Sequence, residues 1–179
     1  MVIRRLSDES IETLRGLIGV SVHTIWCPNL DAAGAHLAAW TLAMLIEKGR
    51  FFNFSCDWSE TPIYLNDSWM IEVSEASDPV NILKNDEGAY IDVCSISIRG
   101  AQPIERIEVF EYQTEIDEEH PEETTLYDQA LVFRCAGGRS FCICCMLNGP
   151  GIATYLHFSE DPAVIEEMTS GSKVRLVLR

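Results

Sequence analysis

The chain has 179 residues and a formal net charge of −15, from 28 acidic and 13 basic side chains. Hydrophobic residues make up 47% of it, which is enough for a folded core and excludes a fully disordered chain. Such an acidic surface repels nucleic-acid phosphates and anionic membranes, so we expect neither as a partner.

The N-terminal residues and the cysteines indicate a compartment. No apolar run of a secretory signal follows Arg4 and Arg5, and the seven cysteines are an odd number without the spacing of a disulfide scaffold. We therefore expect a cytoplasmic protein with free thiols. Cys142 and Cys144 share one face of a predicted strand while Cys145 faces the other way, and paired CxxC knuckles are absent. We expect no metal and no cofactor.

The first elements are a helix and a strand. Ser7 can cap a helix that ends near Arg15, since Asp8 and Glu9 suit its positive end and a glycine follows. The β-branched residues of 17–26 predict a strand. The next stretch, 31–49, fits two structures. Asp31 can cap an alanine-rich helix, or a hairpin can run from residue 40 to residue 58 with its turn at Lys48-Gly49.

An internal repeat favours the hairpin. When the sequence is shifted by 89 residues, Ile18 falls on Ile107 and the residues of the two hairpins match. The second copy, ALVFRCAGGRSFCICC, carries a Gly-Gly pair typical of tight hairpin turns. We therefore expect a hairpin in the first copy too, while a helix over 32–39 remains open before it. The shift aligns Leu42 with Leu131, Met44 with Phe133, Gly49 with Gly138, Phe52 with Phe141 and Cys56 with Cys145.

The whole pattern predicts a mostly β fold of about ten strands and few short helices. We expect a single domain, 1–179, with an internal repeat of 17–98 and 104–178 and a two-fold pseudosymmetric sandwich or barrel. Asp161 caps a short helix that ends near Met168. The predicted strands are 17–26, 40–47, 51–58, 68–73 and 90–98 in the first half, and 104–112, 129–135, 139–146, 152–158 and 173–178 in the second.

The second half contains a strongly acidic connection. Like charges at this density repel one another, so we expect an exposed segment over 111–128. We expect this segment to bind a basic protein partner. The candidate partner-binding residues are Glu115, Asp117, Glu118, Glu119, Glu122, Glu123 and Asp128.

Catalytic motifs are not evident. The histidines form no HxH or HExxH pair, no nucleophile elbow is present, and neither glycine cluster opens a helix as a phosphate-binding loop does. We therefore expect a binding protein, not an enzyme. Two alternatives stay open. One is a small-molecule-binding or enzymatic β-barrel with a cavity between the halves near His23, His36 or His157. The other is a structural homodimer or larger homo-oligomer that uses the apolar second faces of the hairpins.

The hairpin ALVFRCAGGRSFCI and the following LHFSEDPAVI resemble small, acidic, mostly β immunity proteins of bacterial toxin systems. The resemblance covers residues 104–168 best and reaches 17–73 only through the repeat. It implies a protein that binds a cognate toxin and blocks it. Because toxin nucleases are often basic, an acidic inhibitor gains association rate and selectivity from complementary charge.

Overall fold

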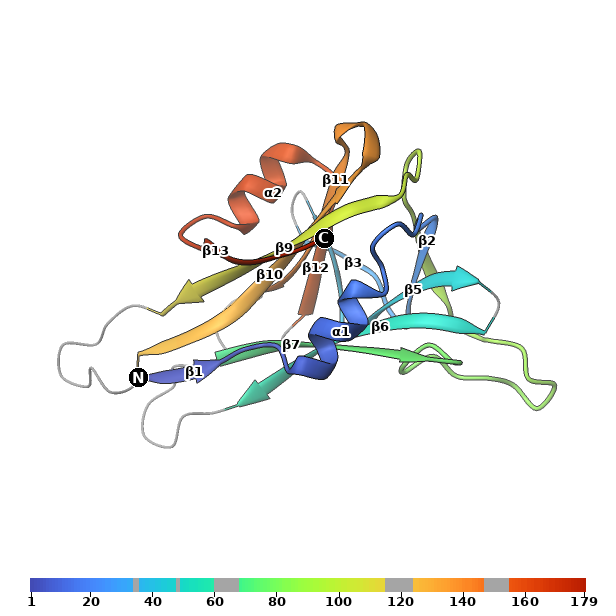
Figure 1. Ribbon diagram of the computed structural model, residues 1–179. Helices are drawn as coiled ribbons and strands as arrows, with labels where there is room; N and C mark the ends of the chain where they lie inside the picture. The colour runs from blue at the N-terminus through green and yellow to red at the C-terminus, as the bar shows by residue number, and fades with distance from the viewer. Residues whose placement is uncertain (34–35, 48, 60–67, 115–123, 147–154) are drawn as a thin grey trace.

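The computed structural model describes residues 1–33, 36–47, 49–59, 68–114, 124–146 and 155–179 (Figure 1). Across these residues the chain forms thirteen strands and two helices in two sheets, so the predicted mostly β fold is confirmed. Neither sheet closes into a barrel, because both have free end strands in the described part.

The five-stranded sheet is antiparallel throughout and has the order β7-β6-β5-β2-β8. Its central hairpin, β5–β6, is the one that the repeat predicted. Its strands are β2 (Thr24–Cys27), β5 (Leu42–Glu47), β6 (Arg50–Ser59), β7 (Ser68–Ala76) and β8 (Cys94–Ser97).

The eight-stranded sheet runs β13-β9-β10-β11-β12-β4-β3, with β1 added in parallel along the start of β10. The chain passes from this sheet to the other between β4 and β5, at Trp40 and Thr41. Its strands are β1 (Val2–Arg4), β3 (Asp31–Ala33), β4 (His36–Ala39), β9 (Ile104–Gln113), β10 (Thr125–Cys135), β11 (Ser140–Met146), β12 (Tyr155–Ser159) and β13 (Lys173–Leu178).

Five strands of each sheet follow one order. The first sheet reads β8-β2-β5-β6-β7, and the second contains β13-β9-β10-β11-β12. The hairpin registers also correspond, since Leu42 lies opposite Phe54 while Leu131 lies opposite Ile143. The shift of 89 residues found in the sequence therefore relates the two hairpins pair by pair.

The predicted strand 17–26 is wrong over its first seven residues. Residues 17–20 form tight turns after the first helix, with Leu17 buried and Gly19 at φ 83°. Strand β2 begins only at Thr24, and Ile25 lies opposite Met44 as Ile107 lies opposite Phe133. Ile25, not Ile18, is thus the counterpart of Ile107. Burial of Leu17 and two glycine turns outweighed the β propensity of this stretch.

Residues 31–47, for which the sequence left helix and hairpin open, form strands in their described part. Residues 31–33 and 36–39 form the short hairpin β3–β4, so no helix occupies the described part of 32–39. Both predicted hairpins exist, with Gly49 at φ 75° and Gly137 and Gly138 at 73° and 80°. These positive φ values are those that glycine supplies at low cost in tight turns.

Both predicted helices are present. Helix α1 (Asp8–Arg15) is capped by the Ser7 hydroxyl, and α2 (Pro162–Met168) is capped by Asp161. The Ser10 hydroxyl on α1 exchanges 3.2 Å hydrogen bonds with the backbone N–H and C=O of Val73, which protects the free edge of β7. Neither helix in the described chain is long and apolar enough to cross a bilayer.

The main core lies between the two sheets. Phe54 of one sheet meets Phe133 of the other with ring centroids 6.1 Å apart, and Phe133 stacks on Phe141 at 4.5 Å. The outer faces are covered differently. Helix α2 packs on the eight-stranded sheet (Figure 1), while the Asn53 side chain of the other sheet bonds the backbone of Asp78 and Val80 in the loop 77–93.

A disulfide joins Cys56 of β6 to Cys145 of β11, that is, one sheet to the other. The expectation that all seven cysteines are free thiols is therefore wrong for this pair. The repeat had placed these two residues at equivalent core positions, and the face-to-face packing of β6 and β11 brings them together. The other five cysteines are unpaired: Cys27, Cys94, Cys135, Cys142 and Cys144.

Candidate functional site

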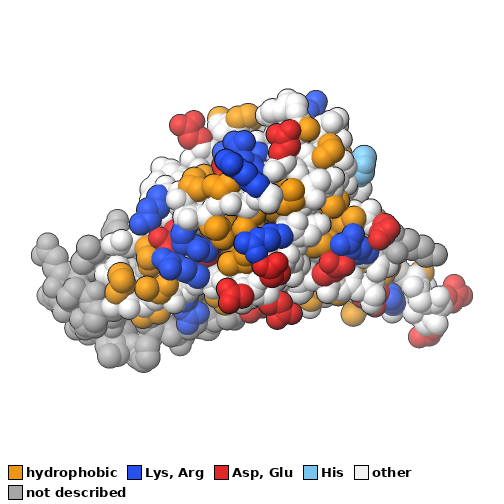
Figure 2. Space-filling model, viewed as in Figure 1, with side chains coloured by type: hydrophobic (Ala, Val, Ile, Leu, Met, Phe, Trp, Pro, Cys, Tyr) orange, Lys and Arg blue, Asp and Glu red, His pale blue; other side chains and the backbone are white. Residues whose placement is uncertain are grey.

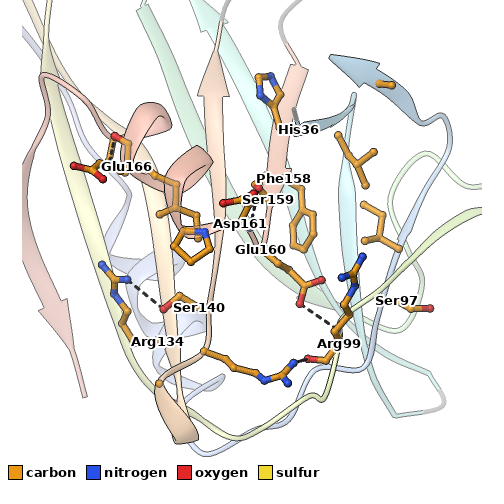
Figure 3. A pocket seen from close by; sticks show the side chains of 18 residues that line it. His36, Ser97, Arg99, Arg134, Ser140, Phe158, Ser159, Glu160, Asp161 and Glu166 are labelled. Carbon is orange, nitrogen blue, oxygen red and sulfur yellow. Dashed lines mark hydrogen bonds between the residues drawn. The ribbon is translucent and has the colours of Figure 1, made fainter. Parts of the chain in front are cut away.

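An open groove of about 1050 Å³ lies beside helix α2 (Figure 3). Its walls come from both sheets. Strand β8 and the residues after it belong to the five-stranded sheet, whereas the β3–β4 hairpin, the start of β11 and the end of β12 belong to the eight-stranded sheet. The polar side chains that Figure 3 labels in it are His36, Ser97, Arg99, Arg134, Ser140, Ser159, Glu160, Asp161 and Glu166.

Two arginines of the groove are held by the protein itself. Arg134 donates to Glu108 at 2.9 Å and to the Ser140 hydroxyl at 3.2 Å. Arg139 donates to the backbone carbonyl of Arg99 at 2.5 Å. Burial opposes ionisation of Glu108, but hydrogen bonds from Arg134 and Arg106 prevail and lower its pKa. These contacts fix the floor of the groove.

The opposite wall of the groove is acidic. Glu160 accepts a hydrogen bond from the backbone N–H of Arg99 at 3.1 Å, and Asp161 accepts one from Ala163 at 2.9 Å as the cap of α2. Glu166 is exposed on α2. Because three arginines and three acidic residues line it, the groove suits a polar segment better than an enclosed apolar molecule.

Two of the histidines named from the sequence lie together here. His36 lines the groove, and its ring meets that of the buried His157 with centroids 4.5 Å apart. His23 lies apart from them, at a smaller pocket on the five-stranded sheet. No three His, Cys, Asp or Glu side chains of the described residues gather in a way that holds a metal ion.

Six of the seven acidic residues predicted to bind a partner lie outside the described residues. They are Glu115, Asp117, Glu118, Glu119, Glu122 and Glu123. The strands on either side are well defined: Gln113 of β9 lies opposite Leu126 of β10, and Thr114 and Thr125 are hydrogen-bonded to each other. The acidic segment is therefore anchored at both ends to the same strand pair.

Asp128, the seventh of these acids, is completely buried in β10. Arg175 donates to both of its oxygens, at 2.7 and 2.5 Å, and the backbone N–H of Leu6 donates to it at 2.8 Å. Beside it, the buried Glu111 accepts two hydrogen bonds from Arg5. Asp128 therefore fastens the N-terminal arm and β13 to the sheet and is not exposed to a partner in this conformation.

The two buried carboxylates, Glu111 and Asp128, and their arginine partners Arg5 and Arg175 were not predicted from the sequence. One signal was present, since Glu111 continues the alternation of Ile107 and Val109 on the inward face of β9. A carboxylate at such a position needs a cationic or hydrogen-bonding partner.

No protein-family model, curated protein or solved structure matches the chain.

Proposed function

We propose that this protein is a non-enzymatic binding protein that captures a basic protein, in the manner of an immunity-type toxin inhibitor. The observation that carries the proposal is the segment 115–123, which has six acidic residues and no lysine or arginine. Its ends continue from the paired strands β9 and β10. A rigid sheet thus carries a concentrated negative charge, which favours fast and selective association with a cationic surface.

The described surface supports the same partner chemistry. Asp8, Glu9 and Glu12 are exposed on α1, and Figure 2 shows acidic side chains along this part of the molecule. Basic side chains on the same face gather over β13, where Arg175 is paired with the buried Asp128. Part of the positive charge is thus neutralised internally, and the outward balance stays acidic. That balance disfavours nucleic acid and anionic membranes as partners.

The test neutralises the acidic segment and compares it with an equal charge change elsewhere. The first variant carries E115Q, D117N, E118Q, E119Q, E122Q and E123Q. The matched control carries E72Q, D86N, E87Q, D92N, E166Q and E167Q, at positions that are all exposed. Each tagged protein is exposed to lysate of the source organism at low salt and at about 0.5 M salt, where charges are screened beyond a few ångströms.

We expect the wild-type protein and the control to retain the same basic protein at low salt and the segment variant to lose it. If both variants lose it equally, net charge alone is responsible and the docking segment is wrong. If the wild-type protein retains no basic protein under either condition, the proposed function is wrong.

We extend the proposal to the origin of the fold, which we ascribe to duplication of one five-stranded unit about a two-fold axis. The shared strand order and the hairpin registers support it. The disulfide supports it further, because Cys56 and Cys145 are 89 residues apart and a residue meets its own counterpart only near such an axis. One pair of contacts between the sheets is also reciprocal, since β7 contacts β11 and β12 contacts β6.

A further inference from the structure

The outer face of the five-stranded sheet carries a second hollow, of about 340 Å³, away from the groove. Three aromatic rings form its wall. Trp26 lies 5.4 Å from Phe51 and 5.2 Å from Tyr90, measured between ring centroids, and Phe51 lies 6.1 Å from Tyr90. Leu45 and Glu47 of β5 also line this hollow. We call this hollow the aromatic pocket.

The aromatic pocket occupies positions that the other sheet fills with charged and polar residues. Thr24, Leu45 and Phe51 lie side by side across β2, β5 and β6. In the eight-stranded sheet, the counterparts across β9, β10 and β11 are Arg106, Arg134 and Ser140. At the one aromatic position of this row, Phe51, the eight-stranded sheet has Ser140, so strand pairing alone does not require an aromatic residue there.

The chemistry of the pocket favours an organic cation. Aromatic ring faces attract ammonium groups, and a carboxylate at the rim adds to this attraction. The chain itself provides an example at Tyr90, because the Lys84 ammonium lies 4.9 Å from the centre of this ring and pairs with Asp78. Glu47 at the rim and the net charge of −15 add a long-range attraction for cations.

We infer that the aromatic pocket binds an alkylammonium group, and that in the cell this group is a lysine side chain of the basic partner. The second half of the inference rests on the proposed function. The pocket would hold the aliphatic stem of the lysine against Trp26, which rests on the buried Phe51, and its ammonium near Glu47. It would thereby give selectivity to an association that the acidic segment accelerates.

The test uses two small probes of almost equal shape, choline and 3,3-dimethylbutan-1-ol, of which only choline is charged. Each is titrated into the full-length protein while NMR follows the indole N–H of Trp26, which the variant Trp26→Phe identifies. We expect a saturable shift with choline, with half-saturation at a concentration about fivefold lower than with the neutral alcohol. The variant Glu47→Gln should reduce that preference and leave alcohol binding unchanged. Because Glu47 is exposed, this variant does not endanger folding.

Trp40→Phe is the matched control, since Trp40 is 57% exposed and lies outside the pocket. It should leave choline binding intact. Equal half-saturation for the two probes, or no saturable shift with choline, would overturn the inference. The outcome is separable from the proposed function. A partner captured through segment 115–123 without any choline preference defeats only the inference, whereas choline binding without a captured partner defeats only the proposed function.

Discussion

The two sheets of this protein share one strand order but differ on their outer faces. At equivalent places, Glu108 of β9 lies beside Val132, and Trp26 of β2 lies beside Ala43. Around Glu108 the eight-stranded sheet carries an ion network with Arg106 and Arg134. Around Trp26 the five-stranded sheet carries the aromatic pocket.

This difference shows which parts of the pattern the fold requires. The inward residues of both sheets are apolar throughout the shared core, because burial there must remove hydrocarbon from water. The outward residues need only a cover or a hydrogen-bonding partner. One sheet obtains this from α2 and arginines, and the other from the loop 77–93. Outward positions are thus less constrained than inward ones, and functional differences between the two sheets are to be sought there.

The largest expected effect comes from removing the disulfide that links the two sheets. Replacing Cys56 and Cys145 together by alanine removes the cross-link that closes the 89-residue interval and should lower the free energy of unfolding. For a loop of this length the loss is about 4 to 5 kcal/mol in the chain-entropy model. Urea unfolding of the oxidised protein, of the reduced protein and of the double variant measures it. Reduction should lower the wild-type midpoint and leave the double variant unchanged. Equal wild-type midpoints with and without reductant would contradict the prediction.

The next effect is confined to the eight-stranded sheet. Asp128→Asn should cost about 3 to 5 kcal/mol, because it removes the buried charge to which Arg175 donates two hydrogen bonds and leaves only Glu111, at 4.0 Å, as a counter-charge. Adding Arg175→Met should recover part of this loss, which a double-mutant cycle in urea detects. The shift of 89 residues aligns Asp128 with the buried Ala39, which has no carboxylate to form such a cluster.

The control for this prediction is an exposed ion pair on the other sheet. Arg50 and Glu75 lie 2.8 Å apart with side chains 36% and 43% exposed, so Glu75→Gln should cost no more than about 1 kcal/mol. If Asp128→Asn costs as little as Glu75→Gln, the buried cluster does not fasten the N-terminal arm.

Much of the fold was predictable because it depends on local patterns. A Gly-Gly turn located the second hairpin, the internal repeat extended that prediction to the first, and capping residues located both helices. The failures came from tertiary contacts. Residues 17–20 have strand propensity, yet the burial of Leu17 after α1 turns them. The disulfide required knowledge that β6 packs on β11, which no local pattern contains.

The candidate site was less predictable than the fold. The acidic segment was visible in composition alone, but sequence did not reveal that Asp128 lies buried under Arg175. The groove and the aromatic pocket unite side chains from distant strands, such as Trp26 and Tyr90. Both sites form only once strands and loops far apart in the sequence pack together, and a local sequence pattern does not contain that information.

The smallest expected effect tests the ion network that replaces the aromatic pocket on the eight-stranded sheet. Because the folded pKa of Glu108 is lowered, its interactions stabilise the protein fully above the unfolded pKa of about 4.3. This contribution should disappear as the pH falls through the lower, folded pKa. With Arg106 and Arg134 side chains 42% and 33% exposed, solvent screening limits it to about 1 kcal/mol or less.

The measurement is the difference in unfolding free energy between wild-type protein and Glu108→Gln, followed from pH 7 down to about pH 3. The difference should be greatest near neutral pH and vanish at the acid end, since a protonated Glu108 and a glutamine are both neutral. Glu105→Gln is the control, because Glu105 is exposed on the same strand. Its difference should stay small and flat. A Glu108 difference that is equally flat would mean that the arginines contribute no stabilising charge, and that the two outer faces differ in side-chain packing alone.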